Sequence, residues 1–175
     1  MSEGTSMQKR AHGSMVFSQP SSVENQVSRL YRAPVERVFR LFTDRATLPY
    51  VIALDPKTVN IETLDFWKGG KFAFTVKQSD GSLMRFHGEF REVDPPWRVV
   101  NTTELDAFPG AVTIETDEFE AVGDFTRVTV RWKFERQEDR DKMGGPESEK
   151  IITAMWDHME DLLEKGPPTA VLAGA

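Results

Sequence analysis

The sequence predicts an α+β fold in which a curved antiparallel sheet of about seven strands wraps around a long C-terminal helix. Between residues 58 and 134, six segments with alternating apolar and polar residues follow one another, joined by short turns. From residue 145 to 166 the apolar residues recur at helical spacing instead. A sheet with one apolar face needs a cover, and this last segment is the only predicted element large enough to supply it.

The C-terminal helix is predicted from its apolar stripe and from its two ends. At about 100° per residue, seven apolar side chains fall within one arc, namely Ile151, Ile152, Met155, Trp156, Met159, Leu162 and Leu163. Ser148 is expected to cap the first turn. Lys165, Gly166 and Pro167 give a basic last turn, a left-handed position and a stop. A helix with so wide an apolar face must lie on a large apolar surface or roof a cavity.

One strand and two short helices are predicted before the six-strand segment. Residues 26–32 alternate, with Val27, Arg29 and Tyr31 on one face. Pro34 then begins a helix that ends near Asp44, because proline is tolerated at the first helical position. A second short helical turn is expected over residues 47–52.

The six later strands are expected at residues 58–66, 71–77, 83–93, 97–104, 111–121 and 125–134. A bulge in the first of them would reconcile its two apolar faces. Gly88, in the middle of the third, suits a bend. Because twist accumulates over many strands, the two ends of such a sheet can grip the helix.

One domain is expected from residue 23 to 166, between an N-terminal tail (1–22) and a C-terminal tail (167–175). The first 22 residues are rich in Ser, Gly, Gln and Met and lack sustained periodicity, which predicts a flexible tail. The alternative is an arm that docks through Val16 and Phe17. The mixed-charge run over residues 135–142 is expected to form a solvated loop.

Composition excludes several classes of function. A net charge of -6 and a pI of about 5.2 argue against nucleic acid and anionic membrane surfaces as partners. No apolar run is long enough for membrane insertion. The absence of cysteine excludes a thiol nucleophile and favours a reducing, cytoplasmic setting. Neither a metal-binding spacing of His, Asp and Glu nor a phosphate-binding glycine loop is present, so no cofactor is expected.

Several segments, taken in order, resemble one known family. They are Tyr31-Arg32-Ala33-Pro34, Lys68-Gly69-Gly70-Lys71-Phe72, Asp80-Gly81, the run from His87 to Pro96, Gly123-Asp124-Phe125-Thr126-Arg127-Val128, and Trp156 with Met159 and Leu162-Leu163. Together they resemble the START-like, or Bet v 1-like (SRPBCC), superfamily, in the branch named after the activator of Hsp90 ATPase. The resemblance runs from about Gln26 to Lys165 and implies the helix-grip fold, with a cavity between the terminal helix and the concave sheet.

This resemblance implies binding of an apolar small molecule, such as a lipid, a polyketide or an aromatic metabolite. The candidate ligand-binding residues are Tyr50, Phe72, Phe74, Phe86, Phe90, Trp132, Met155, Trp156 and Met159. Twelve Phe and seven Met residues suit an adaptable apolar lining. Met155 stands where the family often has glycine, so its longer side chain is expected to fill part of the cavity.

Two other classes of function stay open. The first is an enzyme of the polyketide cyclase, aromatase or hydrolase type, for which the candidate polar groups are Tyr50, Asn101, Thr103 and His158. His87 is expected to be solvated or salt-bridged rather than catalytic. The second is a co-chaperone-like module that binds Hsp90, which the family name suggests.

Overall fold

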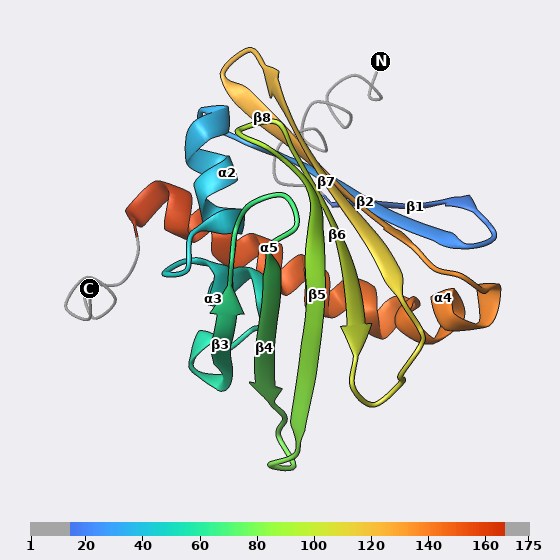
Figure 1. The fold of residues 1–175 in the computed structure, drawn as a ribbon. Helices are drawn as coiled ribbons and strands as arrows, with labels where there is room; N and C mark the ends of the chain where they lie inside the picture. The colour runs from blue at the N-terminus through green and yellow to red at the C-terminus, as the bar shows by residue number, and fades with distance from the viewer. Residues whose placement is uncertain (1–14, 167–175) are drawn as a thin grey trace.

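The computed structural model describes residues 15–166 and confirms the predicted α+β class. Within this range, eight antiparallel strands form one sheet in the order β1-β2-β8-β7-β6-β5-β4-β3. The sheet is curved, and the long helix α5 (Pro146–Lys165) crosses one of its faces (Figure 1). This is the helix-grip arrangement.

Six of the strands form the predicted meander. They are β3 (Val59–Leu64), β4 (Lys71–Lys77), β5 (Leu83–Asp94), β6 (Arg98–Leu105), β7 (Thr113–Val122) and β8 (Phe125–Lys133). Each pairs with the next along the chain. The expected bulge in β3 is present as a register shift between Ile61 and Thr63.

Gly88 lies in the middle of β5, in close contact with β6 and with the Phe72 ring. A Cβ atom built on it would lie 1.7 Å from the carbonyl oxygen of Thr102 and 2.7 Å from Cζ of Phe72. Only glycine therefore lets β5 approach β6 this closely while the Phe72 ring covers it. A second register shift, between Phe90 and Glu92, adds to the curvature of β5.

Two short helices lie between the first predicted strand and the meander, as expected. Strand β2 (Glu24–Tyr31) is followed by α2 (Val35–Thr43), α3 (Leu48–Ile52) and the single turn η1 (Pro56–Thr58). From α2, the Phe42 ring packs edge-on against Phe119 and Trp156, with centroid distances of 5.3 and 5.8 Å. Helix α2 therefore joins the sheet and α5 in one core.

The prediction of a flexible N-terminal tail is wrong for residues 16–21, which form strand β1 (Val16–Ser21). β1 pairs with β2, and Phe17 lies opposite Val27 and packs against the core. The physical reason is that β2 would otherwise present an unpaired edge, which any extended segment can cover through its backbone. The rest of that tail, residues 1–14, and the predicted C-terminal tail, 167–175, lie outside the described residues.

The prediction of a loop over residues 135–142 is also wrong, because helix α4 (Gln137–Met143) occupies most of it. Arg136 forms an ion pair with Asp139 at helical spacing. Arg140 is buried and donates to the carbonyl oxygen of Ser21 at 3.3 Å. Contact with β1, rather than periodicity of its own, holds this helix in place.

The ends of α5 agree with the predicted range but not with the predicted cap. Gly145, at φ 108°, is the N-cap, and Pro146 occupies the first turn, so Ser148 already lies inside the helix. Gly166 ends it at φ 76°, and its N–H donates to the carbonyl oxygen of Leu162.

Buried polar contacts tie the middle of α5 to β2. The buried Arg29 forms ion pairs with Asp157, at 2.5 Å, and with Glu160. The Tyr31 hydroxyl donates to the carbonyl oxygen of Trp156 at 3.1 Å. Burial raises the pKa of Tyr31 well above its ordinary value, so the hydroxyl keeps its proton. These contacts fix the height of the helix above the sheet.

Candidate functional site

A cavity of about 1350 Å³ lies between the sheet, α3 and the N-terminal part of α5. The apolar residues of α5 differ in burial along the helix. Trp156, Met159, Leu162 and Leu163 are buried, and Trp156 also lines the cavity. Ile151, Ile152 and Met155 line it with part of their surface exposed. The C-terminal part of the predicted stripe therefore packs in the core, and its N-terminal part roofs the cavity.

Seven of the nine predicted ligand-binding residues line this cavity. They are Phe72, Phe74, Phe86, Phe90, Trp132, Met155 and Trp156. Met159 is fully buried and belongs to the core. Tyr50 packs against the core, and the α3 side chains that line the cavity are Leu48, Val51 and Ile52. Met155, expected to fill part of the cavity, lines it and leaves a large volume open.

The sheet side of the cavity is a continuous aromatic row. Phe72 and Phe74 stack at 6.0 Å between ring centroids, and Phe74 and Phe86 stack at 5.0 Å. Phe90 adjoins Phe72 at 5.3 Å. Because the strands carry these rings on one face, a flat or extended apolar molecule finds a long contact surface there.

Two carboxylic acids interrupt this apolar lining, and sequence reasoning missed both. Glu115 and Asp117 lie on the inner face of β7 and line the cavity. The indole N–H of Trp132 donates to Oε2 of Glu115 at 2.5 Å. Oδ1 of Asp117 is buried and has no hydrogen-bond partner among residues 15–166. A buried oxygen without a partner is unusual in a folded protein.

Burial raises the pKa of both acids. For Asp117 the pKa lies well above its ordinary value, first because of desolvation and then because of the Glu115 charge. For Glu115, desolvation raises the pKa, and the hydrogen bond from Trp132 opposes it. Asn101, opposite Glu115 on β6, donates to Oγ1 of Thr103 at 3.0 Å and is buried.

The signal for these acids was present in the alternation of β7. Phe119 is buried, and Glu115 and Asp117 are four and two residues before it, so they share its face. The density of charged residues in this strand hid that pattern.

The two described histidines lie outside the cavity and are weaker candidates for a functional site. His158 is exposed and does not line the cavity. Nδ1 of His87 lies 2.8 Å from Oδ1 of Asp106, which agrees with the expected salt-bridged position. Among residues 15–166, no group of three or more His, Asp or Glu side chains could hold a metal ion. No described helix could cross a membrane.

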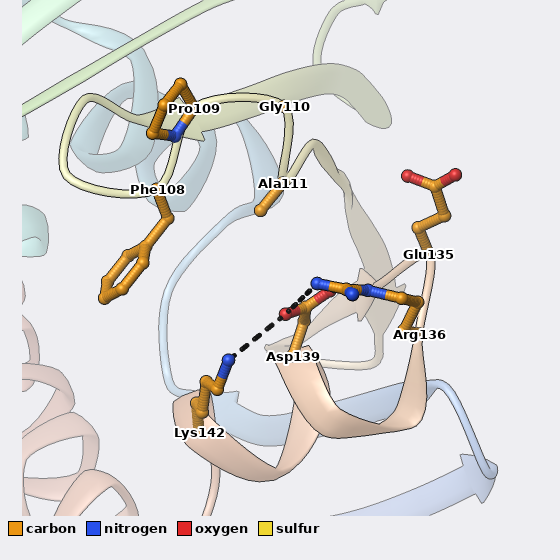
Figure 2. A pocket seen from close by; sticks show the side chains of 8 residues that line it. All are labelled: Phe108, Pro109, Gly110, Ala111, Glu135, Arg136, Asp139 and Lys142. Atoms are coloured by element: carbon orange, nitrogen blue, oxygen red, sulfur yellow. Dashed lines mark hydrogen bonds and ion pairs between the residues drawn. The ribbon is translucent and has the colours of Figure 1, made fainter.

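A second cavity, of about 430 Å³, lies between the loop after β6 and helix α4 (Figure 2). Its walls are Phe108, Pro109, Gly110 and Ala111 on one side and, on the other, charged residues of α4 and of the segment just before it. Figure 2 shows Asp139 between Arg136 and Lys142, both of which form ion pairs with it. Since these charges satisfy one another, the larger cavity with its unpaired carboxyl is the stronger candidate site.

Solved structures share this fold. A crystal structure of a protein from Rhodobacter sphaeroides has a TM-score of 0.75 at 17% identity, over 86% of this chain and 97% of that one. A solution structure of a protein from Arthrobacter aurescens has a TM-score of 0.74 at 22% identity, over 86% and 91%. A crystal structure of an HSP90 activator from Plasmodium falciparum has a TM-score of 0.51 at 26% identity, over 63% and 72%.

The family is shown by the sequence. No curated protein matches the chain. The family described as "Activator of Hsp90 ATPase homolog 1-like protein" matches residues 32–164, which span the fold from the end of β2 to the last turn of α5. The chain therefore belongs to the family of activator of Hsp90 ATPase homolog 1-like proteins.

Proposed function

We propose that this protein binds an apolar small molecule in the cavity under α5. The observation that carries the proposal is the cavity of about 1350 Å³, walled by the aromatic row of the sheet and roofed by the exposed half of the α5 stripe. Its volume exceeds that of most small-molecule pockets. A lipid, a polyketide or an aromatic metabolite of several rings would fit its size and lining. We propose a cytoplasmic setting, since the chain lacks the disulfide framework that is common in small secreted domains.

The proposed contacts are the seven lining residues named above. Burial of apolar surface, at roughly 25 cal/mol per Å², would supply most of the binding free energy. Entry is proposed beside α3, whose residues Leu48, Val51 and Ile52 line the cavity. The short helix has no buried residue of its own, so it is the least anchored part of the roof.

Calorimetric titration with a fatty alcohol, a flavonoid and an aromatic polyketide tests this function. Saturable binding of at least one of them, with a negative heat-capacity change from apolar burial, is the expected result. Failure of all three to bind, at concentrations up to their solubility, would refute the proposal.

A second candidate function rests on the similarity to the Plasmodium falciparum HSP90 activator and on the family itself. In this case the chain would bind a chaperone of the Hsp90 class and change its ATPase rate. The measurement is the steady-state ATPase rate of a purified Hsp90 with increasing amounts of this protein. An unchanged rate at saturating protein would exclude the activator role and leave the cavity proposal standing.

A further inference from the structure

The carboxyl pair of Glu115 and Asp117 stands in the cavity without a neighbouring cation. On β6 the residues opposite the pair are Asn101 and Val99, and on β8 they are Trp132 and Val130. None of these four side chains ionises. The acids are two positions apart on one strand face, so their Cα atoms are roughly 7 Å apart and one small group can contact both.

The other charged residues that line the cavity are Asp55, Lys77 and Glu149. The only cation among them, Lys77, lies on β4, three strands from β7, which is roughly 14 Å at the usual strand spacing. Arg29, on β2, already pairs with Asp157 and Glu160 of α5. The described residues therefore leave the pair without a counter-charge.

We propose that the ligand of this cavity is an apolar amine, whose protonated nitrogen binds between Glu115 and Asp117 while its apolar body lies along the aromatic row. This inference rests on the proposed function and names the chemical class of the ligand. An ammonium group supplies what the site lacks, since it donates a hydrogen bond to Oδ1 of Asp117 and brings the opposite charge.

Other polar ends fit the pair less well. A hydroxyl group can donate a hydrogen bond to Oδ1 of Asp117, but it brings no positive charge to balance the two acids when they ionise. A carboxylate, as in a fatty acid, would add a third acid to a desolvated site and be repelled. The elevated pKa of both acids agrees with this, because an unfilled site favours their protonated forms. A bound cation lowers both pKa values again, so amine binding releases protons at any pH at which the empty site still holds them.

The experiment compares three ligands with the same alkyl chain and different ends, dodecylamine, 1-dodecanol and dodecanoate. Titration calorimetry is carried out below the micelle concentrations of the two charged ligands and below the solubility of dodecanol. Dodecylamine should bind about tenfold more tightly than dodecanol, the effect of one charge-assisted hydrogen bond. Dodecanoate should bind more weakly than dodecanol. Titration of dodecylamine in two buffers with different heats of ionisation should show net proton release.

Two variants distinguish amine binding at Glu115 and Asp117 from attraction by the general negative charge of the protein. Glu115→Gln with Asp117→Asn keeps the shape and removes the acids, and should abolish the preference for the amine over dodecanol. Glu120→Gln removes an acid from the opposite face of the same strand, where Glu120 is exposed and pairs with Arg127, and should keep the preference.

The outcomes distinguish the two proposals. If all three ligands bind equally, or if the double variant keeps the preference for the amine, the amine inference is overturned and the apolar cavity remains. Tighter binding of dodecanoate would overturn it as well. If none of the three ligands binds, the cavity proposal fails together with the inference.

Discussion

Asp117 places a desolvated carboxyl group in an apolar cavity, and this lowers the stability of the folded protein. Its raised pKa means that the folded chain holds a proton more tightly than the unfolded chain does. Stability is therefore lost as pH rises from about 4, the ordinary pKa of aspartate, through the elevated folded pKa.

Asp117→Asn should therefore stabilise the protein above this pH window. The expected gain is about 1 kcal/mol, or roughly 2–4 °C in the melting temperature at pH 8, and the gain should shrink as the pH approaches 4. Thermal unfolding of both forms from pH 4 to 8 measures it. Equal melting temperatures at pH 8 would show that this carboxyl is solvated.

Trp156 is the residue on which the helix, α2 and the sheet converge. It is 3% exposed, and its ring contacts those of Tyr31 and Phe42. Trp156→Ala should lower the free energy of unfolding by about 3–5 kcal/mol, because it leaves a large void in a packed core. Denaturant titration measures this loss. His158→Ala, two residues away and exposed, is the control and should change it by less than about 0.5 kcal/mol.

At the residue scale, sequence periodicity predicted which side chains are buried better than it predicted which of them face the cavity. The burial of Trp156 follows from the apolar arc of α5, since spacing alone sets it. Whether Met155 or Met159 faces the cavity depends on where the helix sits along the sheet, which Arg29 and Tyr31 fix through contacts more than 120 residues apart in sequence. Glu115 and Asp117 were missed because acids are expected on a wet face.

At the scale of the element, the strands that alternate cleanly were predicted to within one or two residues, and β4 (Lys71–Lys77) to the residue. The two wrong elements, β1 and α4, share one physical cause. Each is held mainly by the other and by β2, through backbone pairing and through Arg140. Neither has a strong period of its own, so no window of sequence reveals it.

Removal of β1 should therefore destabilise the protein. A chain that begins at Val23 loses the pairing of β2 and the cover that Phe17 gives the core, and its melting temperature should fall by at least about 4 °C relative to a chain that begins at Met15. Thermal unfolding of the two truncations compares them directly. Equal melting temperatures would mean that β1 adds no stability in solution.

The close contact at Gly88 in β5 gives a second test at this scale. Gly88→Ala places a methyl group where the Thr102 carbonyl oxygen already lies, so β5 and β6 must separate or the Phe72 ring must move. We expect a loss of about 1–3 kcal/mol, the usual cost of overpacking. A matched change on the same strand is Glu89→Ala, which is exposed. If both variants unfold at the same denaturant concentration, the strands are not as close as described.

For the whole molecule, the order of elements was enough to predict the architecture. A meander from β3 to β8 with one apolar face and one long amphipathic helix leaves few compact arrangements. The size of the cavity could not be predicted in this way. It depends on how far the curved sheet stands from α5, and the same Phe and Met residues would serve a filled core.

A change that narrows the cavity without touching the core tests the whole arrangement. Thr113 lines the cavity near the start of β7, and no side-chain hydrogen bond of the described residues depends on it, so Thr113→Phe adds a ring to the cavity wall. Glu89→Phe adds the same ring on the outer face of β5. If ligands lie along the sheet, Thr113→Phe should weaken binding of a flavonoid about tenfold or more, and of the thinner 1-dodecanol less, because a bulky ligand has fewer ways around the new ring. Calorimetric titration of both variants with both ligands measures the difference. Equal weakening by Glu89→Phe would place the binding on the outer surface, in conflict with the proposed role of the helix as the roof of the site.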